Sequence, residues 1–181
     1  MIWNRLVDVD AHGSNALRLK NQGTLLWNSM SFFAHSGDSW FWMAGLIITW
    51  LVTHGEWHRK SSLIAIAVSA LAVLVLAIKF TVRRQRPAGE WGAIYRNTDP
   101  HSFPSGHAAR VFLLATMAVG LGPLWFALLL VIWAPLVSIS RVAMGVHYLS
   151  DIIAGMILGL LAGWVMLQFS PLLIAWIPWI F

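Results

Sequence analysis

The sequence predicts an all-α protein, a polytopic membrane helix bundle. Of its 181 residues, 59% are hydrophobic and 10% are charged, whereas a soluble domain carries roughly a quarter charged residues. Its apolar runs are long and show no strand-like alternation, and within a bilayer only helices and closed barrels satisfy the backbone hydrogen bonds. We therefore expect five core transmembrane helices, possibly six, and an N-terminal interfacial amphipathic helix, all in one membrane-embedded domain covering residues 1–181.

Residues 1–38 are expected to lie at the membrane interface. The first 24 are mixed and polar, and their acidic residues interrupt any apolar region that a cleaved signal peptide would need. Residues 25–33 carry apolar side chains at helical spacing over a short length, which is typical of an interfacial helix. A Ser-Gly-Asp turn follows and ends at Asp38, a residue type that caps helices.

Five longer apolar runs predict the transmembrane helices, at residues 39–54, 61–80, 105–120, 124–140 and 149–169. The first run is slightly short for a span and is expected to borrow flanking residues. A tight polar loop precedes the second run, and the longest polar stretch within the bundle, residues 81–103, follows it. Pro171 is expected to interrupt the last helix, so that the apolar tail 171–181 forms an interfacial helix or a partial sixth span.

Three glycines recur every four residues in the fifth run, at Gly155, Gly159 and Gly163. Such a seam of small residues lets two helix backbones approach each other closely. We interpret it as a packing feature rather than as part of a binding site.

The composition excludes several classes of function. No cysteine is present, which excludes disulfides, zinc–thiolate sites and cysteine nucleophiles. The net charge of +5 with seven carboxylates suits anionic lipid or a phosphorylated substrate as a partner, besides the bilayer itself. The basic residues form no stripe on a soluble module, so nucleic acid is not expected as a partner. Nothing in the sequence predicts an oligomeric state.

Polar residues gather at four of the predicted helix ends, which antiparallel connectivity places on one side of the membrane. Lys79 and Arg86 are two helical turns apart and share a face if the helix continues. Each residue taken by itself has a structural explanation: Lys79 could snorkel to the interface, and Arg86 could end a helix. A histidine, a carboxylate and three cations together at one membrane edge are rare unless they have a function. The residues at these ends are Lys79, Arg86, Ser105, His107, Ser140, Arg141, His147 and Asp151.

The chemistry of this cluster predicts phosphoryl transfer without a metal. Three cations beside a helix N-terminus suit a phosphate, and two histidines offer a nucleophile and an acid. Asp151 can hold the proton on one nitrogen of His147 and leave the other nitrogen to attack. A metal phosphatase would need more carboxylates than those near the site, Glu90, Asp99 and Asp151. We therefore expect neither a metal nor another cofactor.

These residues resemble the three-part signature of the type-2 phosphatidic acid phosphatase superfamily, the acid phosphatase and vanadium haloperoxidase group. The match covers eleven positions between residues 79 and 151: Lys79-x6-Arg86-Pro87, Pro104-Ser105-Gly106-His107 and Ser140-Arg141-x5-His147-x3-Asp151. Soluble haloperoxidases share the signature, but the composition excludes a soluble enzyme. The resemblance therefore implies a bacterial integral membrane lipid phosphatase, whereas residues 1–38 and 171–181 carry no motif.

The resemblance also implies a role for each matching residue. His147 would attack phosphorus, oriented by Asp151. His107 would protonate the leaving group and then activate the water that hydrolyses the phosphohistidine. The neighbouring His101 is expected to be structural. The phosphate oxygens would be bound by Lys79, Arg86, Arg141, Ser105 and the backbone at Gly106.

The expected reaction is hydrolysis of a lipid phosphomonoester or diphosphate. Phosphatidylglycerol phosphate, phosphatidic acid, undecaprenyl diphosphate and the 1-phosphate of lipid A are the candidate substrates, and Gly106 within the motif favours a broad glycerolipid phosphatase. Two alternatives stay open: phosphate transfer from one lipid to another acceptor, and a catalytically silent phospholipid-binding or transport protein. The residues expected near the lipid head group are Arg83, Arg84, Trp91, Tyr95 and Arg96.

Two arguments about the orientation in the membrane conflict. Bacterial relatives generally place the site at the periplasmic face, and the resemblance implies the same here. The positive-inside rule favours the opposite orientation, because ten of the twelve Lys and Arg residues lie on the site side of the predicted topology. Three of these ten are the expected phosphate-binding cations, whose position is explained by their function rather than by the topology. We therefore expect a multi-pass protein of the bacterial inner membrane whose active site faces the periplasm.

Overall fold

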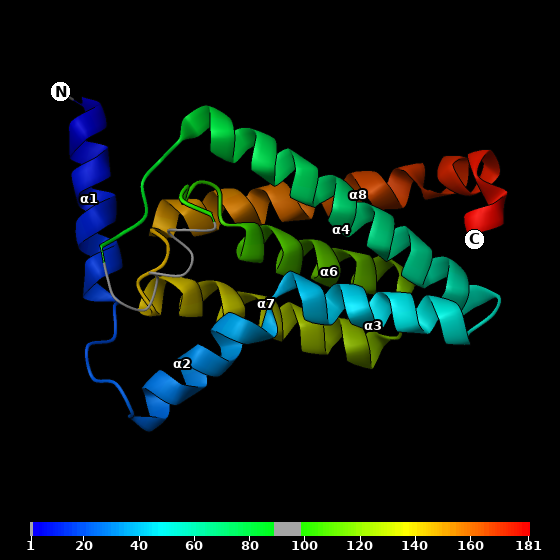
Figure 1. Cartoon of the computed structure of the whole chain (residues 1–181), viewed down its shortest axis with the longest axis horizontal. Coiled ribbons are helices and arrows are strands. Elements are labelled where there is room, and N and C mark those ends of the chain that lie inside the picture. The colour runs from blue at the N-terminus through cyan, green and yellow to red at the C-terminus, as the bar shows by residue number, and fades with distance from the viewer. Residues whose placement is uncertain (1, 89–98) are drawn as a thin grey trace.

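The structure, a computed structural model, describes residues 2–88 and 99–181, and the side chains from residue 7 onward. Within these ranges the chain forms seven α-helices and a short 3-10 helix, Pro178–Ile180, which confirms the all-α class (Figure 1). An isolated antiparallel bridge joins Gln85 to His101. The helices are α1 (Ile2–Ala16), α2 (Leu25–Ser36), α3 (Ser39–Val52), α4 (Glu56–Val82), α6 (Gly106–Leu121), α7 (Leu124–Ala143) and α8 (Leu149–Trp176).

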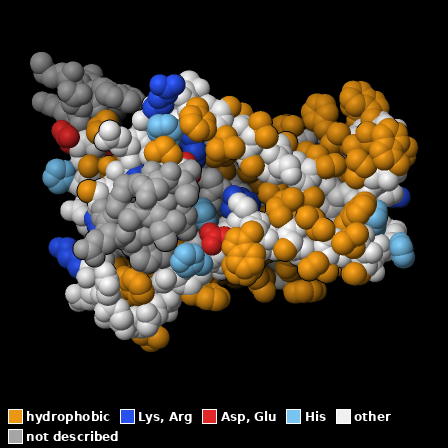
Figure 2. Space-filling view, in the orientation of Figure 1, with side chains coloured by type: hydrophobic (Ala, Val, Ile, Leu, Met, Phe, Trp, Pro, Cys, Tyr) orange, Lys and Arg blue, Asp and Glu red, His pale blue; other side chains and the backbone are white. Residues whose placement is uncertain are grey.

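The helices form a membrane-type bundle. Among the described residues, α4, α7 and α8 are long and apolar enough to cross a membrane, and α3 and α6 are shorter apolar helices. Hydrophobic side chains cover the part of the surface formed by α3, α4 and the end of α8 (Figure 2). Charged and histidine side chains gather mainly at the end where α1 and α2 lie. The five predicted runs thus correspond to these five apolar helices.

The N-terminal segment is more ordered than the sequence predicts, because residues 2–16 form a helix that crosses the end of the bundle (Figure 1). From residue 7 onward, polar contacts join this helix, α1, to the start of α8. Its Ser14 Oγ accepts a hydrogen bond from the backbone N–H of Leu149 at 2.9 Å. The predicted interfacial helix corresponds to α2, which also packs on α7, where Trp133 Nε1 donates to Ser36 Oγ at 2.9 Å.

The loop before α4 is shorter than expected. The chain reverses within residues 53–55, where Gly55 adopts φ +67°, a backbone conformation that favours glycine. The polar residues after it enter the first turns of α4 instead of extending the loop, and Lys60 Nζ lies 2.7 Å from the Glu56 carboxylate one turn earlier. A pair at this spacing supports the helix start.

The prediction that Pro171 ends the last helix is wrong, because α8 continues through this residue to Trp176. A proline inside a helix removes one backbone donor and leaves the carbonyl four residues earlier without its usual partner. That carbonyl belongs to Leu167, and Ser170 Oγ donates a hydrogen bond to it at 2.9 Å. The serine therefore replaces the missing backbone donor.

The glycine seam on α8 is a packing feature, as predicted, and it lies against α6. A Cβ atom added at Gly159 would lie 2.1 Å from the Ala109 carbonyl oxygen, and one at Gly155 would lie 2.6 Å from the Ser105 carbonyl oxygen. Any side chain here would push the two backbones apart. The seam therefore holds the start of α6 directly against the start of α8.

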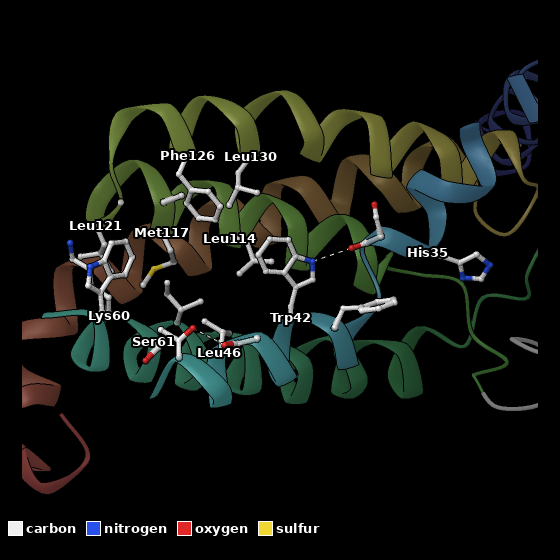
Figure 3. A pocket seen from close by; sticks show the side chains of 18 of the residues that line it. His35, Trp42, Leu46, Lys60, Ser61, Leu114, Met117, Leu121, Phe126 and Leu130 are labelled. Carbon is white, nitrogen blue, oxygen red and sulfur yellow. Dashed lines mark hydrogen bonds between the residues drawn. The ribbon is translucent and has the colours of Figure 1, made fainter. Parts of the chain in front are cut away.

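A large apolar cavity of about 810 Å³ lies between α2, α3, α4, α6 and α7. Figure 3 shows His35 and Lys60 at its opposite ends, with Leu114, Met117 and Trp42 between them. Trp42 Nε1 donates to the Ser36 carbonyl at 3.1 Å, and Lys60 is paired with Glu56. The ionisable residues predicted to do chemistry lie elsewhere, so this cavity is not the candidate site.

Candidate active site

The four predicted helix ends meet around a second cavity of about 440 Å³. It lies between the start of α3, the end of α4, the start of α6 and the connection from α7 to α8. Asp151 lies directly behind one of its walls, and Ser105 is fully buried beside it. The predicted site residues that line the cavity are Lys79, Arg86, Gly106, His107, Arg141 and His147.

His147 and Asp151 form a buried pair where α8 begins. His147 Nδ1 donates to Asp151 Oδ2 at 3.3 Å, and the same oxygen accepts the Tyr148 backbone N–H at 2.9 Å. Asp151 occupies the third helical position, where a carboxylate caps the N-terminus and favours the helix dipole. The two side chains are 2% and 0% exposed, so their relative orientation is fixed by the helix start.

The electrostatic surroundings keep His147 neutral. Burial, followed by the positive charges of Arg86 and Arg141, lowers the pKa of His147 from 6.5 to about 4, although Asp151 opposes this shift. Arg86 Nη1 lies 3.1 Å from Nε2 of this ring, and because a guanidinium can only donate, Nε2 is the acceptor. The imidazole therefore carries its proton on Nδ1 and a lone pair on Nε2, the form of a nucleophile.

Two of the predicted phosphate ligands share one carboxylate oxygen. Arg86 Nη2 lies 2.8 Å from Asp99 Oδ2, and Lys79 Nζ donates to the same oxygen. Arg86 also donates to the Asp99 carbonyl at 2.7 Å and to the Val146 carbonyl at 3.0 Å. This pair of cations therefore binds an anionic oxygen at the cavity wall.

Arg86 does not reach the site on a continued helix. α4 ends at Val82, and Arg83 takes the left-handed conformation with φ +53°. The chain is then extended, and the bridge from Gln85 to His101 holds it. Side chains two apart in an extended segment point the same way, so Arg84 and Arg86 both turn inward while Gln85 stays exposed.

The remaining predicted residues complete the walls. Arg141 is 0% exposed in the last turn of α7 and donates to the Ala34 carbonyl at 3.1 Å. Ser105 caps α6, since its Oγ accepts the Ala108 backbone N–H at 3.4 Å, and its own N–H donates to the Asp151 carbonyl at 3.0 Å. Ser105 thus fixes the position of α6 but does not line the cavity.

Arg84 lies behind the pair formed by His147 and Asp151. Its guanidinium donates to Asp151 Oδ1 at 2.8 Å and to Asp10 Oδ2 at 2.6 Å. It also lies over the Tyr148 ring, 4.0 Å from the centroid. Asp151 therefore contacts His147 through one oxygen and Arg84 through the other. Of the other residues expected near the head group, Arg83 is exposed and donates through Nε to the Phe80 carbonyl at 2.9 Å, whereas Trp91, Tyr95 and Arg96 lie outside the described residues, as does Glu90.

Asp10 extends this chain of charges to α1. It accepts the Ser150 backbone N–H at 3.0 Å as well as the Arg84 guanidinium. Burial alone would raise the pKa of Asp10, but hydrogen bonds from Ser150 and Arg84 lower it below its usual value. Asp10 is therefore ionised and neutralises Arg84. No spacing rule links residues 10, 84 and 151, so the sequence carried no signal for this contact.

The fold and this cluster define a membrane-type helix bundle with several cations beside a buried histidine–aspartate pair. The sequence profile of the PAP2 superfamily matches residues 60–175, and the chain belongs to that superfamily. It is accordingly a multi-pass membrane enzyme of the lipid phosphatase class.

Individual relatives agree with this membership. An undecaprenyl-diphosphatase from Sulfolobus acidocaldarius is 32% identical over 144 residues, which cover 77% of this chain and 68% of that protein. A decaprenylphosphoryl-5-phosphoribose phosphatase from Mycobacterium tuberculosis is 41% identical over 105 residues, which cover 55% of this chain and 53% of the mycobacterial protein.

Two solved structures share the fold. The phosphatidylglycerolphosphate phosphatase of Bacillus subtilis, a transmembrane PAP2-type enzyme, superposes with a TM-score of 0.74 at 26% identity and covers 93% of this chain and 87% of its own. LpxE of Aquifex aeolicus superposes with a TM-score of 0.70 at 24% identity, covering 87% of this chain and 93% of its own. The second likeness concerns the fold alone.

Proposed function

We propose that this protein is a metal-independent lipid phosphatase that hydrolyses a lipid phosphomonoester or diphosphate through a phosphohistidine. The observation that carries the proposal is the neutral His147, held by Asp151 at Nδ1 and facing a cavity that Lys79, Arg86, Arg110 and Arg141 line. A buried imidazole with one nitrogen fixed and the other basic is an activated nucleophile. Cations around it stabilise the charge that develops on phosphate oxygens.

The first step transfers the phosphoryl group to the enzyme. His147 Nε2 attacks phosphorus, a P–N bond forms, and the bond from phosphorus to the lipid oxygen breaks. Lys79, Arg86 and Arg141 hold the phosphate oxygens, and the carboxylate of Asp99 that now lies on Lys79 and Arg86 marks where an anionic oxygen binds. His107, which lines the same cavity, supplies the proton that the leaving oxygen takes.

The second step regenerates the enzyme with water. His107, now neutral, accepts a proton from a water molecule that attacks phosphorus, and the P–N bond breaks. Inorganic phosphate leaves, and His147 returns to its neutral form with Nδ1–H on Asp151. The proton gained by His107 restores the acid for the next cycle.

The shape of the cavity supports a lipid substrate. Its polar end carries the cations, and its other wall is an apolar strip on α4 that runs from Leu76 back to Val68. A lipid can place its phosphate at the cations and its chain along this strip. The names of the relatives support polyprenyl and glycerolipid phosphates as substrate classes. We propose undecaprenyl diphosphate, phosphatidylglycerol phosphate and phosphatidic acid as the first substrates to try.

The test is a substrate panel with the purified protein in detergent and an excess of chelator. We expect release of inorganic phosphate from at least one lipid, inhibition by vanadate, and an acid-labile, base-stable phosphoenzyme when labelled substrate is quenched. Turnover that needs an added divalent ion would contradict the mechanism. Tight binding of lipid phosphate without turnover would favour a silent binding protein, and transfer of label to a second lipid in preference to water would favour a phosphotransferase.

We further propose that α3, α4, α6, α7 and α8 span a bacterial inner membrane, with α1 at the interface and the site facing the periplasm. Support comes from the position of α1 across the site end of the bundle (Figure 1). The sequence has no cysteine, so a cysteine introduced at the exposed Ala88 reports the side of the membrane. We expect an impermeant maleimide to label this variant in cells whose outer membrane alone is permeabilised. Labelling that requires opening of the inner membrane would reverse the orientation.

A further inference from the structure

We propose that Asp38 is a positioning residue for the acid–base histidine: its carboxylate accepts the Nε2–H of His107 and favours the protonated ring, so that the site contains two histidine–carboxylate pairs. This inference rests on the proposed function. Asp151 and His147 form the pair of the nucleophile, and Asp38 and His107 form the pair of the acid. Asp38 lies outside every motif in the sequence and comes from the turn between α2 and α3.

The contact is direct and well shielded. His107 Nε2 lies 2.7 Å from Asp38 Oδ1, and the two side chains are 15% and 20% exposed. Both residues line the cavity that holds Lys79, Arg141 and His147. A charge-assisted hydrogen bond of this length, largely shielded from water, favours the imidazolium over the neutral ring.

The Asp38 side chain does not cap α3, although its position before the helix predicts that it would. It is the N-cap residue of α3, with the extended backbone typical of a cap, but its side chain makes no capping hydrogen bond. An aspartate at this position ordinarily accepts a backbone N–H of the first turn. Here Oδ1 faces His107, and Oδ2 lies 3.3 Å from His35 Nδ1. The carboxylate is therefore directed at the histidines and not at the helix that it begins.

The turn that carries Asp38 is held in place from several sides. A Cβ atom added at Gly37 would lie 2.7 Å from Val137 Cγ1 and 3.3 Å from His107 Cδ2. Arg110 Nη1 donates to the Gly37 carbonyl at 2.7 Å. The turn is thus pressed against α6 and α7, and the carboxylate approaches the imidazole from a fixed direction.

The charges around His107 show why a carboxylate is needed. Arg110 and Arg141 disfavour a positive charge on the ring, and in the part of the chain that the structure describes Asp38 is the carboxylate that bonds to it. Burial alone would raise the pKa of Asp38, but the hydrogen bonds and charges of His107 and His35 lower it below its usual value. Asp38 is therefore an anion. Within residues 2–88 and 99–181, the other titratable and charged groups that face His107, its partner or their cavity are Arg110 on α6, Arg141 on α7, His35 on α2, Lys79 on α4, Arg86 and Asp99 in the following loop, and His147 before α8.

Asp38 thus determines which proton moves. The imidazolium has two N–H groups, and the one on Nε2 stays with Asp38. The proton on Nδ1 passes to the lipid oxygen as its bond to phosphorus breaks, which leaves a neutral ring. In the second step Nδ1 takes a proton from the attacking water, so the ring and Asp38 end the cycle as they began.

The test compares wild type with Asp38→Asn over a range of pH, using two leaving groups. At pH 8 we expect kcat/KM for a lipid phosphate, whose alkoxide leaving group needs a proton, to fall about 10- to 100-fold, because general acid catalysis is lost. For an aryl ester such as 4-nitrophenyl phosphate, whose leaving group needs no proton, we expect a change of less than about threefold. The basic limb of the lipid profile should move to lower pH by about one unit.

The matched control is Asp8→Asn, which removes an exposed carboxylate on α1 and should leave both profiles unchanged. Asp38→Ser is a second variant that removes the charge but keeps a side chain able to cap α3, and it should show the same separation between the two leaving groups even if Asp38→Asn folds poorly. Equal loss on both substrates with an unshifted profile would overturn the inference. In that case phosphoenzyme formation on His147 would still uphold the proposed function, whereas a wild type without turnover would refute the function itself.

Discussion

Replacing His147 with alanine is expected to reduce turnover by at least about 10⁴-fold and to abolish the labelled phosphoenzyme. The substitution removes the nitrogen that attacks phosphorus, and loss of a covalent nucleophile costs more than loss of any group that only assists it. Binding is expected to survive, because Lys79, Arg86 and Arg141 remain around the cavity. The measurements are phosphate release, phosphoenzyme labelling after an alkaline quench and vanadate binding on the same preparation.

The matched control for this variant is His54→Ala. His54 is exposed in the short loop before α4, at the opposite end of the bundle, and its loss should leave all three measurements within error of wild type. Residual phosphoenzyme in His147→Ala would show that another residue is the nucleophile. His107 would then be the first residue to test, since it lines the same cavity.

Asp151→Asn is expected to reduce kcat by about 10²- to 10⁴-fold and to destabilise the protein by about 3 kcal/mol. Both carboxylate oxygens accept hydrogen bonds: Oδ1 from Arg84, and Oδ2 from His147 and from the Tyr148 backbone. The amide of asparagine has one acceptor and one donor, so its NH₂ must face either the Arg84 guanidinium or the imidazole N–H. The first choice places two donors against each other and leaves Asp10 as the carboxylate partner of Arg84, and the second disfavours the Nδ1–H tautomer that the nucleophile needs.

A double-mutant cycle with Arg84→Met separates these two effects. If the amide nitrogen faces Arg84, removing the guanidinium should restore most of the lost stability, measured as the melting temperature in detergent, while kcat stays low. Strictly additive losses would show that Arg84 and Asp151 act independently. That result would contradict the contact at 2.8 Å described above.

The membrane bundle could be predicted from the sequence because its spans are long and apolar, and each run from 39–54 to 149–169 matches a helix. Two errors have physical causes. The helix Ile2–Ala16 makes polar contacts to the start of α8 through Ser14 and Asp10, and contacts of this kind leave no pattern in the sequence. The helix continues through Pro171 because the Ser170 hydroxyl donates a hydrogen bond to the Leu167 carbonyl. The rule that proline interrupts a helix does not take such a side-chain hydrogen bond into account.

Two kinds of site residue could be predicted from the sequence: residues close together in the chain, and residues at helix ends that lie on the same side of the membrane. His147 and Asp151 are one helical turn apart, and antiparallel spans bring Lys79, His107 and Arg141 to the same side. The carboxylates that bond to the histidine or to Arg84 from distant parts of the chain could not be predicted. Asp38 and Asp10 meet their partners across 69 and 74 residues, and only the packing of α1, α2 and α3 against the core brings them there.

The glycine contact between α6 and α8 fixes the relative position of two residues of the candidate site. His107 is carried by α6 and His147 precedes α8, and these two helices touch backbone to backbone at Gly155 and Gly159. The separation of His107 and His147 is therefore set by a two-helix frame whose backbones touch. Under the proposed function, the chemistry would reside on this frame, and the choice of lipid would reside on the apolar strip of α4 that lines the same cavity.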